Sequence, residues 1–342
     1  MRKQSKRRKM KVLVTGATGF LGKYIVEELS REGYEVIAFG RNEKKGRELT
    51  VKYPKTYFVK GDFENRTDLE KINHIEEDGK NIDFVIHAGG LSTVWGRWND
   101  FYSANVKGTE NIIDFCRQSS NIQKLVFVSS PSIYAKAEDG LFIKEEEAPT
   151  ENNLNFYIKS KLIAEDRIKK SSDIPWVIIR PRGLFGIGDT SIIPRLLNLN
   201  NRIGIPLFSK GEQMVDVTCV ENVALSIRIA MEKETSAGGI YNITNDEPMK
   251  FKDILDLFFK EMNIEGKYVN LNYKITKFIV TIMEKVYSIL RIRKEPPLTL
   301  YTLYLLKYSQ TLSVKKAKKE LGYSPKMTVK EGVIKYVKHN KH

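Results

Sequence analysis

Tyr157 and Lys161 are the two side chains of this sequence best placed for proton transfer. They lie four residues apart in a segment with apolar residues at helical spacing, so both point from one helix face. A free phenol titrates at about pH 10, but a neighbouring ammonium favours the phenolate and lowers its pKa. We therefore predict an acid/base tyrosine tuned by a lysine. Taken alone, such a pair is typical of a solvated helix face.

Ser130 is the candidate partner of this pair. It follows Val126-Phe127-Val128, a buried-strand pattern, and a hydroxyl at the carboxyl end of such a strand faces the ligand crevice. Ser129 should face away, because neighbours on a strand alternate. Ser132 is the alternative hydroxyl if the strand ends two residues later.

A glycine-rich loop near the start of the chain predicts a dinucleotide site. It follows an apolar strand at 11–15 and leads into a helical pattern at 21–31. Its glycines allow a tight turn, close approach of backbone amides to a diphosphate, and close packing of helix on strand. We expect the loop to bind the cofactor through Gly16, Thr18, Gly19, Phe20, Leu21 and Gly22.

Strand and helix patterns alternate along the first half of the chain. Strands are expected at 11–15, 35–39, 56–60, 83–87, 124–129 and 175–180, and helices at 21–31, 67–76, 98–118 and 155–171. This rhythm predicts an α/β fold with a doubly wound, mostly parallel Rossmann sheet. It breaks near residue 183, where Gly and Pro become frequent.

Composition favours a cytoplasmic enzyme. The two cysteines lie far apart in a chain of 342 residues, which argues against disulfides, and four histidines suggest no metal cluster. No apolar stretch approaches the about 20 residues of a membrane span. The net charge of +15 is either ordinary surface charge or an attraction for anionic ligands. Nucleic acid is not expected as a partner, because the basic residues are scattered.

The glycine loop, the serine-ended strand and the Tyr/Lys helix, in this order, resemble the extended short-chain dehydrogenases/reductases. The resemblance runs from about residue 11 to about 328. It implies that Asn105 is the active-site asparagine, positioning Lys161 through water, while Lys161 binds the nicotinamide ribose. It also implies that Asp62, followed by Phe63, contacts adenine. The segment with Pro181 and Arg182 would border the nicotinamide. His87-Ala88-Gly89-Gly90, also near the cofactor, departs from the usual His-x-Ala-Ala.

The same resemblance implies the domain plan. Residues 11–182 would form the NAD(P)-binding domain after a basic tail at 1–10, and 183–342 mainly a smaller substrate lobe. Segments near 214–232 and 240–244 would return to the first domain. Homodimers through a helix pair are common in the family.

Within the superfamily, three segments are similar to the 3β-hydroxysteroid dehydrogenase-like group, which includes bacterial reductases of long-chain 3-keto acids. They read LSTVWGRWNDFYSANVKGT, SSPSIY and LSVKKAKKELGYSP. The resemblance implies hydride transfer between a secondary alcohol and a ketone. Ser130 would bind the substrate oxygen and Tyr157 would protonate it.

The end of the second strand bears on the cofactor. NAD-preferring relatives carry an acid there that binds the ribose 2′-hydroxyl, whereas this chain has Gly40-Arg41-Asn42. Without the acid, Arg41 could bind a 2′-phosphate. We expect a preference for NADP(H), with NAD(H) as the alternative.

Two features of the sequence argue against a reaction on a nucleotide sugar. Ser130-Pro131-Ser132 replaces the Thr-Asp-Glu of the dehydratases, and Val215 stands where many sugar enzymes have an arginine. An NAD-dependent nucleotide-sugar epimerase is the first alternative. A non-catalytic cofactor sensor is the second.

The segment 275–292 has apolar residues at helical spacing between basic flanks. Such a helix could lie peripherally on a membrane surface, roof an apolar pocket, or pack in the core of the substrate lobe. We expect a hydrophobic substrate. Trp95 and Trp98 could add an aromatic wall to its pocket or serve in packing.

Overall fold

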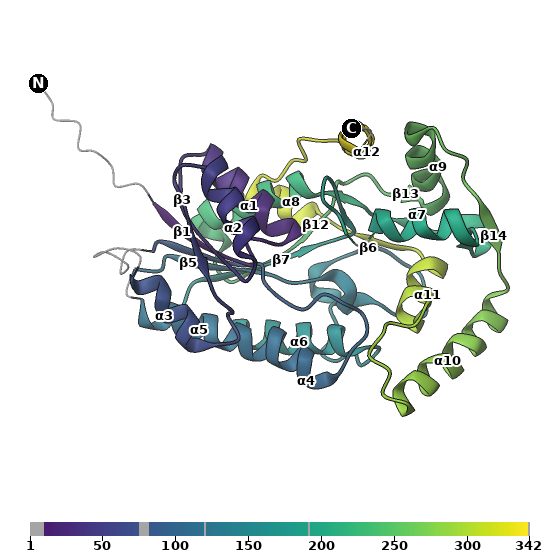
Figure 1. The fold of residues 1–342 in the computed structure, drawn as a ribbon, viewed down its shortest axis with the longest axis horizontal. Helices are drawn as coiled ribbons and strands as arrows, with labels where there is room; N and C mark the ends of the chain where they lie inside the picture. Colours follow the sequence, from purple (N-terminus) through teal and green to yellow (C-terminus); the bar gives the residue numbers. More distant parts are fainter. Residues whose placement is uncertain (1–9, 75–81, 120, 191, 341–342) are drawn as a thin grey trace, which may run out of the picture.

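The computed structural model describes residues 10–74, 82–119, 121–190 and 192–340. All but the last residue of the expected basic tail therefore lies outside the described residues. Seven parallel strands form the main sheet in the order β3-β2-β1-β4-β5-β7-β12 (Figure 1). The strands are β1 (Lys11–Thr15), β2 (Glu35–Gly40), β3 (Thr56–Lys60), β4 (Phe84–His87), β5 (Lys124–Val128), β7 (Trp176–Pro181) and β12 (Gly239–Ile243).

Helices cover both faces of this sheet, which is why its central strands are apolar on both sides. One face carries α1 (Phe20–Arg31), α2 (Glu43–Lys52) and α8 (Val220–Glu232). The other carries α3 (Arg66–Glu70), α5 (Gly108–Gln118) and α6 (Phe156–Lys169) (Figure 1). The predicted doubly wound Rossmann sheet is confirmed.

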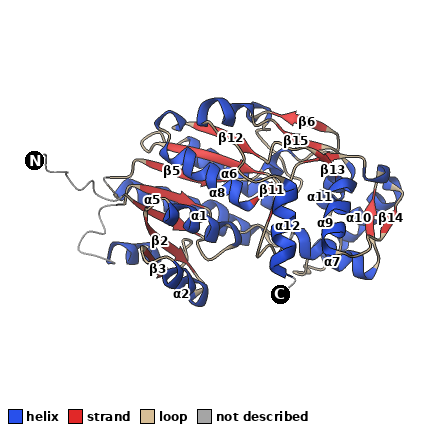
Figure 2. Ribbon diagram, turned by 90° about the horizontal axis from the view of Figure 1, so that it is seen from above, coloured by secondary structure: helices blue, strands red, loops and turns tan. Residues whose placement is uncertain are grey.

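A smaller lobe is formed mainly by residues after β7, with one strand, β6, from before it. Figure 2 shows its four-stranded sheet, of order β13-β10-β15-β6, set apart from the main one. Its strands are β6 (Gly140–Ile143), β10 (Met214–Val215), β13 (Met249–Lys250) and β15 (Gln310–Leu312), and two short pairs join β8 (Leu184–Phe185) to β11 (Thr218–Cys219) and β9 (Ile205–Leu207) to β14 (Tyr268–Asn270). Its helices are α7 (Ile192–Arg202), α9 (Phe251–Met262), α10 (Tyr273–Ile289), α11 (Leu300–Lys307) and α12 (Val329–Asn340).

The segment expected to return to the first domain divides between the two lobes. α8 packs on α1, and β12 extends the main sheet beside β7. β10 instead pairs with β13 and β15 in the smaller sheet, so the start of 214–232 does not join the main sheet. No helix in the described part of the chain has the length and apolar character needed to cross a membrane.

Two helices differ from the expected pattern. The segment 98–118 divides into α4 (Trp98–Phe101), a π-helical segment at Tyr102–Lys107 and α5. α2 was not expected, because its sequence EKKGRELTVK has few apolar residues. Asn42 caps it by accepting a hydrogen bond from the Lys45 amide at 3.0 Å.

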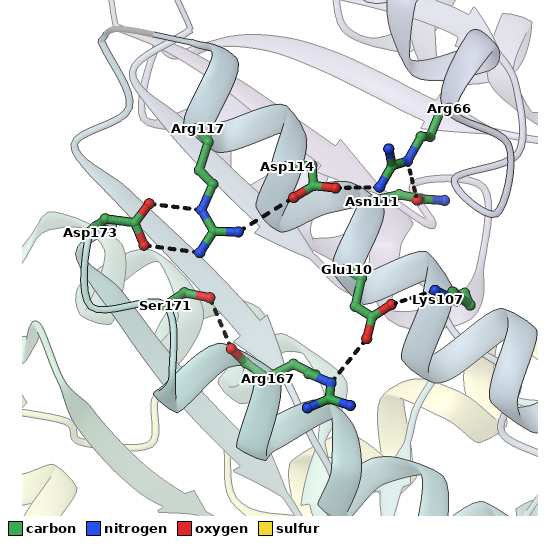
Figure 3. A network of polar contacts seen from close by, with 9 residues as sticks. All are labelled: Arg66, Lys107, Glu110, Asn111, Asp114, Arg117, Arg167, Ser171 and Asp173. Carbon is green, nitrogen blue, oxygen red and sulfur yellow. Dashed lines mark hydrogen bonds and ion pairs between the residues drawn. The ribbon is translucent and has the colours of Figure 1, made fainter.

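Ion pairs join the outer surfaces of α5 and α6 (Figure 3). Arg167 of α6 lies 2.9 Å from Glu110 of α5, and Arg117 of α5 lies 2.7 Å from Asp173 just beyond α6. Each exposed pair contributes at most about 1 kcal/mol. Together they fix how α6, which carries Tyr157 and Lys161, lies against α5.

Candidate active site

Ser130 directly follows β5 and opens a 3-10 turn at Pro131–Tyr134. Its hydroxyl accepts a hydrogen bond from the Ser132 amide at 3.2 Å, which caps the turn. The Ser129 hydroxyl points elsewhere and donates to Glu165 at 2.5 Å. The expected alternation is therefore confirmed, with Ser130 on the side of the turn and Ser129 directed toward α6.

Tyr157 lies in the first turn of α6, which packs on this 3-10 turn. A hydrogen bond with Ser130 lowers the pKa of the phenol, but burial outweighs it and raises the pKa to about 12. The prediction of a lowered phenol pKa is therefore wrong, because burial has a larger effect than the groups that favour the phenolate. Desolvation of the phenolate dominates, and Tyr157 is a protonated acid at neutral pH.

Lys161 lies one turn further along α6 and is buried. Its ammonium donates to the Val128 carbonyl at 2.8 Å and lies 4.2 Å from the centre of the Phe127 ring. Burial lowers the pKa of Lys161 to about 8, although the Glu165 carboxylate favours its charged form. The Lys161 ammonium therefore lies at the carboxyl end of β5, close to Ser130.

Asn105 holds the segment after β4 against α6. Its side-chain nitrogen donates to the Leu91 carbonyl at 3.0 Å and to the Ser160 hydroxyl at 2.9 Å, and its oxygen accepts from the Leu91 amide at 2.8 Å. The residue lies in the π-helical segment Tyr102–Lys107, a rare conformation that is frequent at functional sites. The structure thus brings the four predicted catalytic residues, Ser130, Tyr157, Lys161 and Asn105, to one edge of the sheet.

Tyr301 of α11, which was not among the predicted site residues, also reaches this site. Its hydroxyl lies 2.6 Å from that of Ser132, and the Ser130 hydroxyl donates to Ser132 at 3.0 Å. The segment 298–306 is apolar and contains two tyrosines, and this pattern alone does not mark Tyr301. Ser132, the alternative hydroxyl, thus links Ser130 to the substrate lobe.

A buried ion pair that the sequence did not predict also supports the site. Arg180 of β7 binds Glu165 of α6 through two hydrogen bonds of 2.9 and 2.6 Å, and neither side chain is solvent-exposed. Glu165 lies four residues after Lys161, and this spacing was the one signal available in the sequence. Removing one partner of such a pair costs about 3–5 kcal/mol.

The glycine loop has the shape that a dinucleotide requires. Gly16 has φ +69°, and a Cβ there would lie 2.8 Å from the Cα of Gly89. A Cβ on Gly22 would lie 2.0 Å from the Gly16 carbonyl oxygen. Gly19 is the N-cap of α1, and Phe20 and Leu21 form its first turn. Backbone amides thus converge at a helix N-terminus, where a diphosphate can bind.

Comparison with known proteins agrees with this geometry. Residues 12–244 match the NAD dependent epimerase/dehydratase family. The chain belongs to this family. Solved structures of family-like fold include a UDP-glucose 4-epimerase of Thermotoga maritima (TM-score 0.76, 19% identity, covering 97% of this chain and 99% of that one). They also include a UDP-glucuronic acid 4-epimerase of Bacillus cereus in complex with NAD (TM-score 0.74, 21% identity, 96% and 99%).

Several similar proteins are named as reductases or dehydrogenases. The chain is 31% identical to a 2-alkyl-3-oxoalkanoate reductase of Stenotrophomonas maltophilia over 95% of this chain and 97% of the relative. It is 29% identical to a mouse sterol-4-alpha-carboxylate 3-dehydrogenase, decarboxylating, over 97% and 91%. The prediction of an NAD(P)-dependent oxidoreductase acting between alcohol and ketone is confirmed at this level, as is the extended short-chain dehydrogenase/reductase resemblance.

A steric contact explains why this chain has Gly89 where the His-x-Ala-Ala pattern has its first alanine. A Cβ on Gly89 would lie 2.4 Å from the Phe63 ring, and one on Gly108 would lie 2.5 Å from it. The Phe63 ring therefore fills the space that an alanine at 89 would need. Ala88 is half-buried against the core of the main sheet.

His87 lies within the core rather than facing a ligand. Its ring nitrogens lie 2.7 Å from the Thr15 hydroxyl and 3.2 Å from that of Thr109. Burial, with a smaller effect of Lys161, lowers its pKa to about 3. The side chain is therefore neutral, and within the described residues no group of His, Cys, Asp and Glu is placed to hold a metal ion.

The other predicted cofactor residues of the epimerase/dehydratase fold lie at the same edge of the sheet. Arg41 follows β2, and its guanidinium lies 3.4 Å from the Asp62 carboxylate. The Thr18 hydroxyl oxygen lies 2.8 Å from where a Cβ on Gly40 would be. Pro181 ends β7, and Arg182 follows it with a buried side chain.

Proposed function

We propose that this chain is an NADP(H)-linked oxidoreductase that interconverts a hydrophobic 3-hydroxy carboxylate and the corresponding 3-keto acid. The observation that carries the proposal is the convergence of Ser130, Tyr157 and Lys161 at the carboxyl end of β5. Pro131 and Ser132, rather than an acid pair, follow Ser130, so the site has no carboxylates there for eliminating water from a sugar.

The names of two relatives support the substrate class. A 2-alkyl-3-oxoalkanoate carries its carboxylate on the carbon next to the ketone. A sterol 4-alpha-carboxylate oxidised at position 3 carries it on the same relative carbon. Both are hydrophobic, and the feature they share is a carboxylate one carbon removed from the reacting atom.

Each residue of the site has a separate role in the reaction. The cofactor, when bound by the Gly16–Gly22 loop, supplies or accepts the hydride. Ser130 donates a hydrogen bond to the substrate oxygen and so orients the carbonyl. Tyr157 gives its proton to that oxygen during reduction and takes it back during oxidation. The Lys161 ammonium stabilises the phenolate formed in between and binds the ribose hydroxyls.

The preference for NADP(H) rests on Arg41. Its side chain is 75% exposed, and its contact with Asp62 is a surface pair that a ligand phosphate can replace at little cost. A 2′-phosphate would gain a charge-assisted bond from the guanidinium and meet no acid at Gly40, Arg41 or Asn42. NAD(H) lacks this contact.

The test is turnover of a long-chain 2-alkyl-3-hydroxyalkanoate with NADP+, followed as reduced nicotinamide. Tyr157→Phe should lower kcat about 10²- to 10⁴-fold with the cofactor Kd nearly unchanged. Tyr57→Phe removes an exposed phenolic hydroxyl as the matched control and should act as wild type. Full activity of Tyr157→Phe would overturn the mechanism. Tightly retained NAD with epimerisation of a UDP-sugar would favour the epimerase instead.

We also propose that α10 lies on an anionic membrane surface. Figure 1 places it at the outer edge of the smaller lobe, away from the main sheet. It packs on α11, and within α10 Val280 is the buried residue. Seven apolar side chains of this region are exposed: Ile275, Phe278, Ile279, Ile282, Val286, Ile289 and Leu290. This exposure argues against the core-packing alternative.

The charges around α10 fit an anionic lipid surface. Lys274, Lys277 and Lys285 lie on the helix, and Arg291 and Arg293 follow it. The acid on α10, Glu284, is used internally, accepting a hydrogen bond from the Leu300 amide at 2.8 Å. An apolar face with a basic rim is typical of interfacial helices. The segment just after α10 also contacts the segment after β4, where the Trp95 indole donates to the Ile292 carbonyl at 3.0 Å.

Co-sedimentation with vesicles tests this proposal. The chain should bind phosphatidylglycerol vesicles more strongly than phosphatidylcholine vesicles. Phe278→Asp should weaken binding, whereas Val51→Asp on α2, also at a highly exposed apolar residue, should not. A concentration-dependent dimer lost in Phe278→Asp, without vesicle binding by wild type, would assign the face to a second copy and overturn the proposal.

A further inference from the structure

Arg182 is a buried guanidinium close to the reacting groups. It directly follows β7, its side chain is 8% exposed, and in the described part of the chain it forms no ion pair. Arg180, two residues earlier, is a buried arginine with a structural role, since Glu165 neutralises it through two hydrogen bonds. Arg182 has no such carboxylate.

Two groups lie near the Arg182 guanidinium. One is the Tyr301 phenol, whose pKa the guanidinium lowers against the effect of burial. The other is Asp216, which stands beyond ion-pair distance and accepts a hydrogen bond from the Leu312 amide at 2.7 Å. Burial lowers the pKa of Arg182 in spite of both. A guanidinium buried in this way is costly unless an anion pairs with it.

The register of the main sheet gives the position of Arg182 relative to the reacting groups. β7 lies beside β5 with Ile179 opposite Val128, so Arg182 and Ser130 follow neighbouring strands at the same edge of the sheet. Tyr301 lies 2.6 Å from the Ser132 hydroxyl, which accepts from Ser130 at 3.0 Å. Tyr301 therefore links the smaller lobe to the serine that binds the reacting oxygen, and the charge of Arg182 acts on its phenol. A group held by Arg182 would lie close to that oxygen, as the carboxylate of a 3-hydroxy acid does.

We propose that Arg182, with the Tyr301 hydroxyl beside it, binds the substrate carboxylate and selects acids over neutral alcohols. The inference rests on the proposed function and names the residue that sets its substrate class. The guanidinium fork matches the two carboxylate oxygens. Tyr301 can donate its proton to the same group while its oxygen accepts from Ser132. The family resemblance implied that the segment with Arg182 borders the nicotinamide, and the experiment distinguishes the two roles.

The experiment compares two stable substrates in the oxidising direction. One is a long-chain 2-alkyl-3-hydroxyalkanoate, and the other is the matching secondary alcohol without the carboxyl group. Wild type should favour the acid in kcat/KM by at least about 10-fold. Arg182→Gln should lower kcat/KM for the acid about 10- to 100-fold more than it lowers kcat/KM for the alcohol, as expected for the loss of a charged hydrogen bond. Arg182→Lys should recover part of the loss, and Tyr301→Phe should lose less than Arg182→Gln.

The outcomes separate this inference from the proposed function. Equal turnover of acid and alcohol by wild type would overturn the role of Arg182 and leave the oxidoreductase intact, a result that does not depend on any variant folding. A rise in the NADPH Kd of Arg182→Gln that matches its loss of activity would assign Arg182 to the cofactor and also overturn the inference. Failure of wild type to oxidise either compound would overturn the proposed function and this inference with it.

Discussion

The side-chain nitrogen of Asn105 donates a hydrogen bond of 2.9 Å to the hydroxyl of Ser160. Ser160 is the residue before Lys161, so this contact joins the π-helical segment to the active-site helix. The same Asn105 amide bonds both backbone groups of Leu91. Asn105 therefore sets the position of α6 relative to the segment after β4, and it acts on Lys161 through the backbone.

Substitutions at the two ends of this contact should differ in effect. Ser160→Ala removes two hydrogen bonds, one from Asn105 and one to the Tyr157 carbonyl, and should lower the free energy of unfolding by about 1–2 kcal/mol, with a small loss of kcat. Asn105→Ala also leaves the Leu91 backbone groups unpaired and should cost about 2–4 kcal/mol and more of kcat. Urea unfolding and steady-state kinetics measure both. Equal effects of the two variants would contradict the positioning role of Asn105.

Lys161 should determine the pH dependence of reduction. Tyr157, with a pKa of about 12, stays protonated through the neutral range, whereas Lys161, with a pKa of about 8, loses its charge near pH 8. An uncharged lysine no longer stabilises the phenolate left when Tyr157 gives up its proton. The kcat/KM of ketone reduction should therefore fall as pH rises through about 8.

Lys161→Arg is the control for this assignment. Arginine keeps its charge over the whole range, so any activity left in the variant should not show the decline near pH 8. A wild-type profile that is flat from neutral to strongly alkaline pH would contradict the role given to Lys161.

Arg41 should discriminate between the two cofactors. Arg41→Ala should weaken NADPH about 10-fold or more, by the loss of a charge-assisted contact to phosphate, and change NADH little. Arg47→Ala, which removes an equally exposed guanidinium paired with Glu43 on α2, should leave both cofactors nearly unchanged. Fluorescence titration of wild type and both variants measures the Kd of NADPH and the Kd of NADH. An equal loss for NADPH and NADH in Arg41→Ala would remove the argument for NADP(H).

His87 should make the fold sensitive to acid. Its folded pKa of about 3 is below the 6.5 of a free histidine, so the unfolded chain binds a proton that the folded chain does not. Stability should therefore fall as pH drops below about 6.5, by up to about 1.4 kcal/mol per pH unit from this group.

His87→Gln removes this titration. The stability advantage of wild type over the variant should be largest above pH 6.5 and shrink as the solution becomes more acidic, as measured by urea unfolding at several pH values. An advantage that stays constant or grows in acid would contradict a neutral, buried His87.

Most of the parallel sheet and the chemistry of its edge could be predicted from the sequence. The turn at Gly16, the helix face shared by Tyr157 and Lys161, and the strand before Ser130 depend on residues close together in the chain. Backbone geometry makes such patterns local, since helices repeat every 3.6 residues and strands every two. The charged sequence of α2 lacked this signal, and its N-cap and its packing against β3 hold it instead.

Other properties were decided by tertiary structure, because they depend on which distant segments meet and how much water they exclude. The sequence placed Lys161 beside Tyr157 and suggested a lowered phenol pKa, but burial raises it. Tyr301 reaches Ser132 from 169 residues away. Arg180 has a buried carboxylate partner while Arg182, two residues on, forms no ion pair with the described residues. Side-chain type and spacing determined what chemistry this chain can do, and the packing of the smaller lobe against the sheet decided which charges stand beside it.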